Sequence, residues 1–140
     1  LGLERPLKIL DIKSIAENLS VLSEKYGLKV DPYAKVAHLS VSEQQKIEIA
    51  KILYRNVKVI ILDEPTSMLT PQESRDMFKF IRLLVEKGIS VVFVTHKLGE
   101  VFSVSDNITV LSKGKNVFTC ETCKADEKSL IKKIFGDVKE

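Results

Sequence analysis

Two short apolar runs, separated by a strongly marked helix, constrain the fold of this 140-residue chain more than any other feature. Residues 57–62 are rich in valine and isoleucine and lack polar alternation, and residues 90–94 form a second apolar run. This pattern is typical of strands that are buried on both faces in a parallel sheet. Because such strands alternate with helices along the chain, the sequence predicts an α/β fold with a largely parallel sheet.

The helix between these runs is marked at both ends. Thr70 is suited to cap its N-terminus, and Pro71 suits the first helical position. Glu73 completes a capping box, and Gly88 predicts the end of the helix. The expected core face of this helix consists of Met77, Phe78, Ile81, Leu84 and Val85.

Other patterns predict the remaining elements. The start of an earlier helix is ambiguous, because Ser40-x-x-Glu43 and Ser42-x-x-Gln45 both fit the capping-box pattern. The expected buried residues of that helix are Ile47, Ala50, Leu53 and Tyr54. Further helices are expected at residues 11–26, 98–102 and 127–135, and further strands at residues 108–111 and 116–119.

Composition narrows the class of protein. The 22 basic and 19 acidic residues are scattered along the chain and give a net charge of +3, so there is no basic stripe of the kind that binds nucleic acid. The longest apolar stretches are far too short to span a bilayer. We therefore expect a protein that is soluble or peripheral to a membrane and has no nucleic-acid partner.

Cys120 and Cys123 form a C-x-x-C unit, a spacing that both zinc sites and redox motifs use. A zinc site needs a second pair of ligands, and the two histidines, His38 and His96, stand far upstream. We expect incidental surface thiols, with a reversible disulfide as the alternative.

Acidic and imidazole groups stand at the ends of the two predicted strands. Asp63-Glu64 ends the first, and Thr95-His96 follows the second. In open parallel sheets, ligands bind at the carboxyl ends of strands. An acid there can hold Mg²⁺ through water, and a second acid can activate a water for phosphoryl transfer. Taken singly, each motif is equally well explained as a turn or a helix cap.

Four segments in order resemble the ABC ATPases. Residues 39–45 and the helix after them are similar to the signature segment, whose usual form is LSGGQ. Residues 59–66 resemble the Walker B strand, residues 67–70 the D-loop, and residues 94–98 the H-loop, at the spacing usual in that family. The resemblance implies a partial RecA-like ABC ATPase core, with a mostly parallel sheet flanked by helices, at residues 56–140. Part of the helical signature subdomain would precede it at residues 1–55.

The resemblance also implies roles for single residues. Glu64 would be the general base, His96 would contact the γ-phosphate, and Asp63 would hold Mg²⁺ through water. The residues that would contact ATP, the first four of them on a partner cassette's nucleotide, are Ser40, Val41, Ser42, Glu43, Asp63, Ser67 and Leu69.

The chain departs from the family's pattern in two places: in the signature segment, and in the motif that the first half of a cassette carries. Val41 and Ser42 replace the two glycines, and a side chain at Ser42 could weaken or abolish closure over ATP. No G-x-x-x-x-G-K-[ST] phosphate loop occurs in the sequence. The resemblance therefore implies a chain that begins inside the helical subdomain and is inactive by itself. Its exposed sheet edge predicts self-association.

Asp31-Pro32 and residues 43–45 and 69–73 look most like the first cassette of two-cassette importers for sugars or nucleosides. That resemblance implies an ATP-hydrolysing import subunit that uses ATP and Mg²⁺ at the cytoplasmic face of the membrane. Its partners would be a second ATP-binding cassette, membrane permease subunits and, indirectly, a solute-binding protein.

Two other functions stay open. A degenerate cassette half acting as a non-catalytic association module is favoured by Ser42. The C-terminal lobe of a chromosome-segregation or DNA-repair ATPase is disfavoured, because no heptad-patterned coiled coil precedes the signature and no basic face is present.

Overall fold

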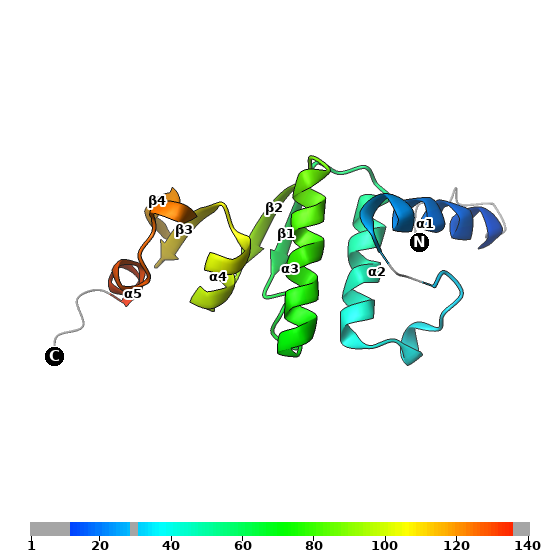
Figure 1. The fold of residues 1–140 in the computed structure, drawn as a ribbon, viewed down its shortest axis with the longest axis horizontal. Helices are drawn as coiled ribbons and strands as arrows, with labels where there is room; N and C mark the ends of the chain where they lie inside the picture. The colour runs from blue at the N-terminus through cyan, green and yellow to red at the C-terminus, as the bar shows by residue number, and fades with distance from the viewer. Residues whose placement is uncertain (1–11, 29–30, 136–140) are drawn as a thin grey trace. The chain divides into compact units, whose positions relative to one another are not determined.

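The computed structural model describes residues 12–28 and 31–135. The chain divides into two compact units, Leu1–Val94 and Thr95–Glu140, and each is described by itself (Figure 1). The elements of the first unit are α1 (Ile12–Tyr26), η1 (Val36–His38), α2 (Val41–Leu53), β1 (Val59–Asp63), α3 (Pro71–Glu86) and β2 (Ser90–Val94). These bounds confirm the predicted helices and the two predicted strands, which alternate as expected for the α/β class.

Gly27 lies at the point where the end of α1 approaches α3. This residue has a φ of 65°, a left-handed conformation that glycine adopts without steric cost, and it ends α1. A Cβ atom at Gly27 would lie 3.0 Å from Cδ2 of Leu83 on α3. The glycine therefore ends the helix through its left-handed conformation, and a Cβ there would also displace the end of the Leu83 side chain slightly.

Ser40, and not Ser42, caps α2. The Ser40 Oγ accepts a hydrogen bond from the Glu43 amide at 3.3 Å, and the Ser40 amide donates to Glu43 Oε2 at 2.9 Å. Ser42 lies within the first turn of the helix and is only 7% exposed. Of the two possible capping boxes, the structure contains the first.

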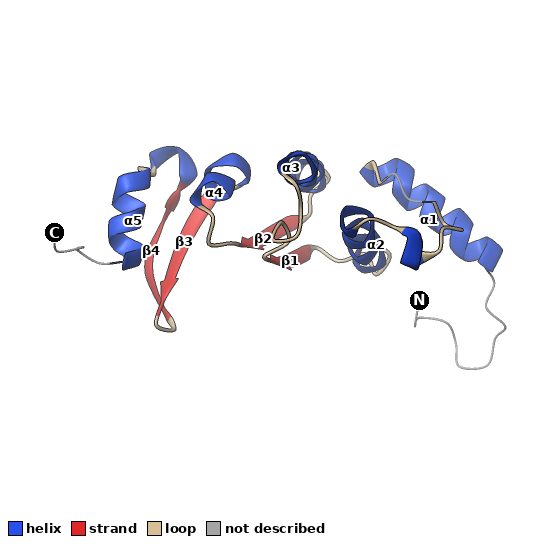
Figure 2. Cartoon of the chain, turned by 90° about the horizontal axis from the view of Figure 1, so that it is seen from below, coloured by secondary structure: helices blue, strands red, loops and turns tan. Residues whose placement is uncertain are grey.

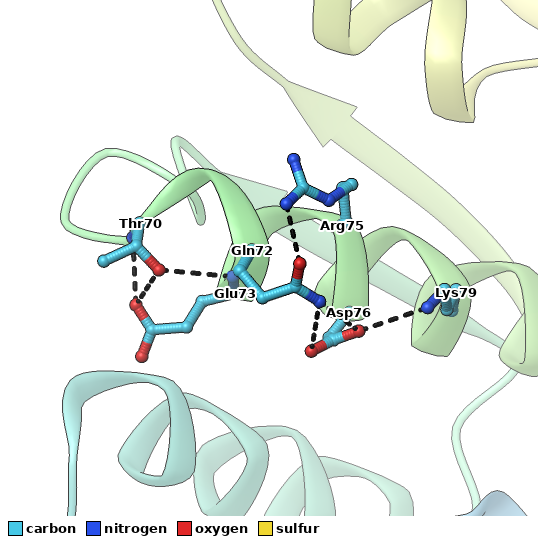
Figure 3. A network of polar contacts seen from close by, with 6 residues as sticks. All are labelled: Thr70, Gln72, Glu73, Arg75, Asp76 and Lys79. Atoms are coloured by element: carbon cyan, nitrogen blue, oxygen red, sulfur yellow. Dashed lines mark hydrogen bonds and ion pairs between the residues drawn. The ribbon is translucent and has the colours of Figure 1, made fainter.

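A second capping box begins α3, as predicted. The Glu73 amide donates to Thr70 Oγ1 at 3.3 Å, and the Thr70 amide donates to Glu73 Oε2 at 2.9 Å (Figure 3). Farther along the exposed side of the helix, Asp76 accepts from Gln72 and forms an ion pair with Lys79 at 3.3 Å. These contacts stabilise the first two turns of α3 from the solvent side.

β1 and β2 form a parallel pair in register from Val59↔Ser90 to Asp63↔Val94. The helix α3 packs on one face of this pair (Figure 2). The rings of Phe78 and Phe93 meet there edge to face, with centroids 6.0 Å apart. Ile60 lies on that face and is 2% exposed. The face that α3 covers therefore forms part of the hydrophobic core of the first unit.

The other face of the β1–β2 pair corrects the prediction that both strands are buried on both sides. Ile61 is 68% exposed, and its register partner Val92 is 47% exposed. Val59 and Val94 are exposed on the same face. Within the described part of the first unit, no element covers this face. The prediction fails because a continuous apolar run does not show whether its own chain supplies two covering layers.

Two predicted helix faces also need correction. On α3, Met77, Ile81 and Leu84 are buried as expected. Val85 is exposed, and Phe80 takes a buried place instead. On α2, Tyr54 is exposed because it follows the last helical residue, and Ile49 is buried in addition to the expected Ala50 and Leu53. On both helices the buried stripe is therefore displaced around the helix axis from the expected one.

The second unit is a hairpin packed against helices. Its elements are α4 (Leu98–Val104), β3 (Asn107–Ser112), β4 (Lys115–Glu121), η2 (Thr122–Lys124) and α5 (Glu127–Phe135). Lys113 and Gly114 both have positive φ angles, as a tight hairpin turn requires, and β3 and β4 pair antiparallel. The core consists of Ile108 and Val110 of β3 and Leu130 of α5.

Cys120 packs against this core, whereas Cys123 is exposed. Both thiols are free, and Cys123 Sγ lies 3.7 Å from Glu121 Oε2. The described residues include no helix that is long and apolar enough to cross a membrane.

Candidate functional site

The candidate catalytic residues of the first unit lie at the end of β1 and in the turn that follows it. Residues 64–67 form this turn, the Glu64 turn. Asp63 is the last residue of β1, and its side chain is exposed. The Glu64 amide donates to the Val94 carbonyl at 2.9 Å, and the Glu64 carbonyl accepts from the Ser67 amide at 3.1 Å. The two acids therefore stand at the carboxyl end of the parallel pair, where ligands bind in such sheets.

The backbone of Glu64 is strained. Its φ is 46°, in the left-handed region that residues with a Cβ seldom adopt. Conformations of this kind cost free energy and cluster at functional sites. Glu64 is half-buried, and Pro65 and Thr66 after it are buried. The carboxylate is therefore only partly accessible, with Oε2 shielded from solvent, and the two residues that follow it are fixed in the protein interior.

The predicted D-loop residues continue from this turn. Ser67 is exposed, and its amide closes the turn on the Glu64 carbonyl. Leu69 is half-buried, and its amide donates to the Thr66 carbonyl at 3.2 Å. The structure thus joins Asp63, Glu64, Ser67 and Leu69 in one continuous hydrogen-bonded segment.

The predicted signature residues lie at the N-terminus of α2. Ser40, Val41 and Glu43 are exposed, whereas the Ser42 side chain is buried. Hydrogen bonds from the backbone and the hydroxyl of Ser40 hold the pKa of Glu43 below its usual range, so this carboxylate stays ionised. The free amides of a first helical turn attract anions, although the capping carboxylate already neutralises part of that field.

Gln45 connects α2 to the Glu64 turn, a contact that the sequence did not reveal. Its Nε2 donates to the Pro65 carbonyl at 2.7 Å. The neighbouring Gln44 instead donates to the Leu39 carbonyl at 3.0 Å, on the segment before the helix. The only signal in the sequence was Gln45 itself, a polar residue near the buried side of the helix, which fitted a capping box equally well.

His96 belongs to the second unit, where it is exposed. The residues around it form a compact turn. Thr95 Oγ1 accepts from the Lys97 amide at 3.1 Å and donates to Glu100 Oε2 at 2.9 Å. Lys97 and Glu100 form an ion pair at 3.2 Å. This turn fixes the backbone on both sides of the histidine.

The acidic residues fit a magnesium ion in one mode. Across residues 12–28 and 31–135, no three histidine, cysteine, aspartate or glutamate side chains form a group that could hold a metal. Mg²⁺ often retains several waters and takes one or two carboxylates together with the substrate's phosphates. The exposed Asp63 carboxylate fits that water-mediated mode, and a cage made only of protein ligands is not formed by the described residues.

Comparison with known proteins identifies the family. The model of the ABC transporter family matches residues 5–67. The chain is 43% identical over 112 residues to the nucleoside import ATP-binding protein NupA of Lactococcus lactis. This alignment covers 80% of the chain and 22% of NupA. The chain belongs to the ABC-transporter ATP-binding cassettes. It is also 44% identical over 115 residues, 82% of the chain, to the glucose import ATP-binding protein TsgD13 of Haloferax volcanii.

Solved cassettes share the fold. The structure matches cbiO1 of Clostridium perfringens, part of the ABC transporter complex cbiONQ, with a TM-score of 0.71 at 23% identity. The match covers 92% of this chain and 50% of cbiO1. The partial RecA-like core predicted from the sequence is thereby confirmed, and the chain corresponds to the C-terminal part of a cassette. It spans about a fifth of the length of NupA and TsgD13.

Proposed function

We propose that this cassette segment belongs to an ATP-hydrolysing subunit that energises import of a sugar or nucleoside. The observation that carries the proposal is the pair Asp63-Glu64 at the carboxyl end of β1, with Glu64 in a left-handed backbone conformation. The relatives NupA and TsgD13, an import protein for nucleosides and one for glucose, support the substrate class.

In this proposal Glu64 is the general base that orients and deprotonates the attacking water. Asp63 holds Mg²⁺ through water, and the ion would neutralise charge on the ATP phosphates. His96 contacts the γ-phosphate. Ser67 and Leu69 contribute the D-loop beside the nucleotide. The hydrogen-bonded Glu64 turn supports these roles, since it holds both acids on one rigid segment.

The signature residues would act on the nucleotide of a partner cassette. Ser40, Val41 and Glu43 are exposed and available for such a contact. The Ser42 side chain is buried, so it does not project from the helix toward a phosphate that approaches the backbone. This placement lessens the cost expected from losing the glycine at that position. It favours a catalytic cassette over a degenerate association module.

The remaining parts of the proposal concern assembly. Within the first unit, a boundary near residue 55 separates the signature subdomain from the ATPase core. A second cassette, membrane permease subunits and a solute-binding protein complete the transporter, at the cytoplasmic face of the membrane. The isolated 140-residue chain is inactive, because its sequence contains no phosphate loop, and it self-associates.

Mutation of the proposed base in the cassette protein that contains these residues tests the function. Glu64→Gln should lower kcat for ATP hydrolysis by about 100-fold or more, with little change in KM, because a positioned base contributes on that scale. Glu86→Gln, at the exposed end of α3, serves as the matched control and should retain full activity. Phosphate release with ATP and Mg²⁺ is the measurement.

Two results would contradict the proposal. Full activity in Glu64→Gln would exclude this residue as the base. A wild-type protein that binds a permease and never releases phosphate would instead establish the association module.

A further inference from the structure

The Gln45 side chain links α2 directly to the Glu64 turn by a hydrogen bond. The bond from its Nε2 to the Pro65 carbonyl is short, at 2.7 Å, and spans 20 positions of sequence. Its other amide atom, Oε1, is shielded from solvent and has no hydrogen-bond partner among the described residues. The bond to Pro65 is therefore the polar contact that orients this amide.

The Glu64 turn is attached at several points. Its amide end is joined to β2 by the bond from the Glu64 amide to the Val94 carbonyl. The Glu64 and Thr66 carbonyls accept from amides of the same segment, those of Ser67 and Leu69. The Pro65 carbonyl between them accepts from a different element, through Gln45. Proline has no amide hydrogen, so this carbonyl is the only backbone hydrogen-bonding group of residue 65.

We infer that Gln45 is a positioning residue, which holds the Glu64 turn against the signature helix through the Pro65 carbonyl. Its consequence for catalysis rests on the proposed function. The left-handed conformation of Glu64 is costly and persists only where surrounding contacts enforce it. Gln45 supplies such a contact from α2. A movement of the signature helix would therefore act through this hydrogen bond on the turn that carries the proposed base.

Amide hydrogen exchange on the 140-residue chain tests the contact without nucleotide. Gln45→Met keeps the length and helix propensity of the side chain and removes the donor. The protection of the Ser67 and Leu69 amides should fall about tenfold, because a buried carbonyl loses its partner. Gln44→Met, the neighbouring glutamine that bonds to Leu39 and not to the turn, is the matched control and should leave both amides unchanged.

Gln45→Glu separates positioning from a loss of packing. At pH 8 its carboxylate cannot donate to the Pro65 carbonyl, so protection of the turn should be as low as in Gln45→Met. When the pH falls toward 4, a protonated carboxyl can donate again, and protection should recover toward the wild-type value. Unchanged protection in Gln45→Met, or a Gln45→Glu variant without recovery at low pH, would overturn the inference.

The catalytic consequence is measured in the cassette protein that contains these residues. Gln45→Met should lower kcat about tenfold with little effect on KM, and Glu86→Gln, at the exposed end of α3, should leave kcat unchanged. If the turn loosens and kcat does not fall while Glu64→Gln is inactive, the positioning role fails and the proposed function stands. If Glu64→Gln is fully active, the proposed function fails, and the exchange result still decides the contact.

Discussion

The two faces of the β1–β2 pair are both rich in apolar residues but lie in opposite environments. Ile60 and Ile61 are adjacent and chemically the same, yet one is 2% exposed and the other 68%. The covered face lies under α3, the helix that connects the two strands. The open face presents Ile61 and Val92 to solvent. The connecting helix can cover one face of its own strand pair, and the second face needs another element.

The difference shows that the apolar composition of a strand reflects the environment of that strand in a complete fold. Both faces carry residues suited to burial, but only the covered face is satisfied within the described residues of this unit. An open apolar sheet face beside unpaired strand edges favours pairing with another molecule. Substitutions on one face at a time test this difference between the two faces.

The largest effect is expected from truncation on the covered face. Ile60→Ala should lower the free energy of unfolding by about 2–5 kcal/mol, since it leaves a cavity beneath α3. Ile61→Ala is the matched control and should change the same quantity by less than about 1 kcal/mol. Urea unfolding monitored by circular dichroism measures both. Equal losses in the two variants would mean that the open face is also covered in solution.

A charge on the open face should act on association. We expect Ile61→Lys to weaken self-association of the chain about tenfold or more, because an interface would have to bury an ammonium in place of an apolar side chain. Asn18→Lys adds the same charge on the exposed side of α1 as a control. Sedimentation velocity over a range of concentrations gives the dissociation constants. A wild-type chain that stays monomeric throughout would disprove the predicted self-association.

The helix that covers the face can be weakened at its cap. Thr70→Ala removes the hydroxyl that accepts from the Glu73 amide and should cost about 1 kcal/mol of stability. Ser20→Ala is the control, because that hydroxyl bonds to the Ala16 carbonyl within a helix and its loss should cost less than about 0.5 kcal/mol. Thermal unfolding compares the two. A larger loss in Ser20→Ala would contradict the assigned cap.

The smallest effect is a pH dependence of the same cap. Hydrogen bonds from the backbone and hydroxyl of Thr70 lower the pKa of Glu73 from its ordinary value of 4.5. A carboxyl whose pKa is lower in the folded state contributes stability above its unfolded pKa and loses it as the pH falls through the folded pKa. Glu73→Gln keeps an acceptor oxygen and does not titrate. Its unfolding midpoint should therefore fall less than that of the wild type between about pH 5 and pH 3.

Glu43→Gln should reproduce that result on α2, because the Ser40 backbone and hydroxyl lower the pKa of Glu43 in the same way. Identical slopes in the wild type and both variants would show that the two caps do not contribute to acid sensitivity.

Much of the fold follows from local signals. Thr70, Pro71 and Glu73 marked the start of α3, and the structure contains that capping box. The alternative caps of α2 could not be separated, because Ser40 and Ser42 fit the same pattern, and the hydrogen bonds between Ser40 and Glu43 decide between them. The site was predicted where residues are adjacent in sequence, as at Asp63 and Glu64. Gln45 was missed because its partner lies 20 positions away.

The sequence alone determined the order of elements, the capping box of α3 and the family motifs, since these depend on residues within a few positions of one another. Tertiary structure decided which face of β1 and β2 is covered, the left-handed backbone at Glu64 and the bond from Gln45 to the Glu64 turn. Each of these depends on groups distant in sequence that meet only after the chain folds. Burial and hydrogen bonding between elements depend on these contacts between distant groups, which no local sequence pattern encodes.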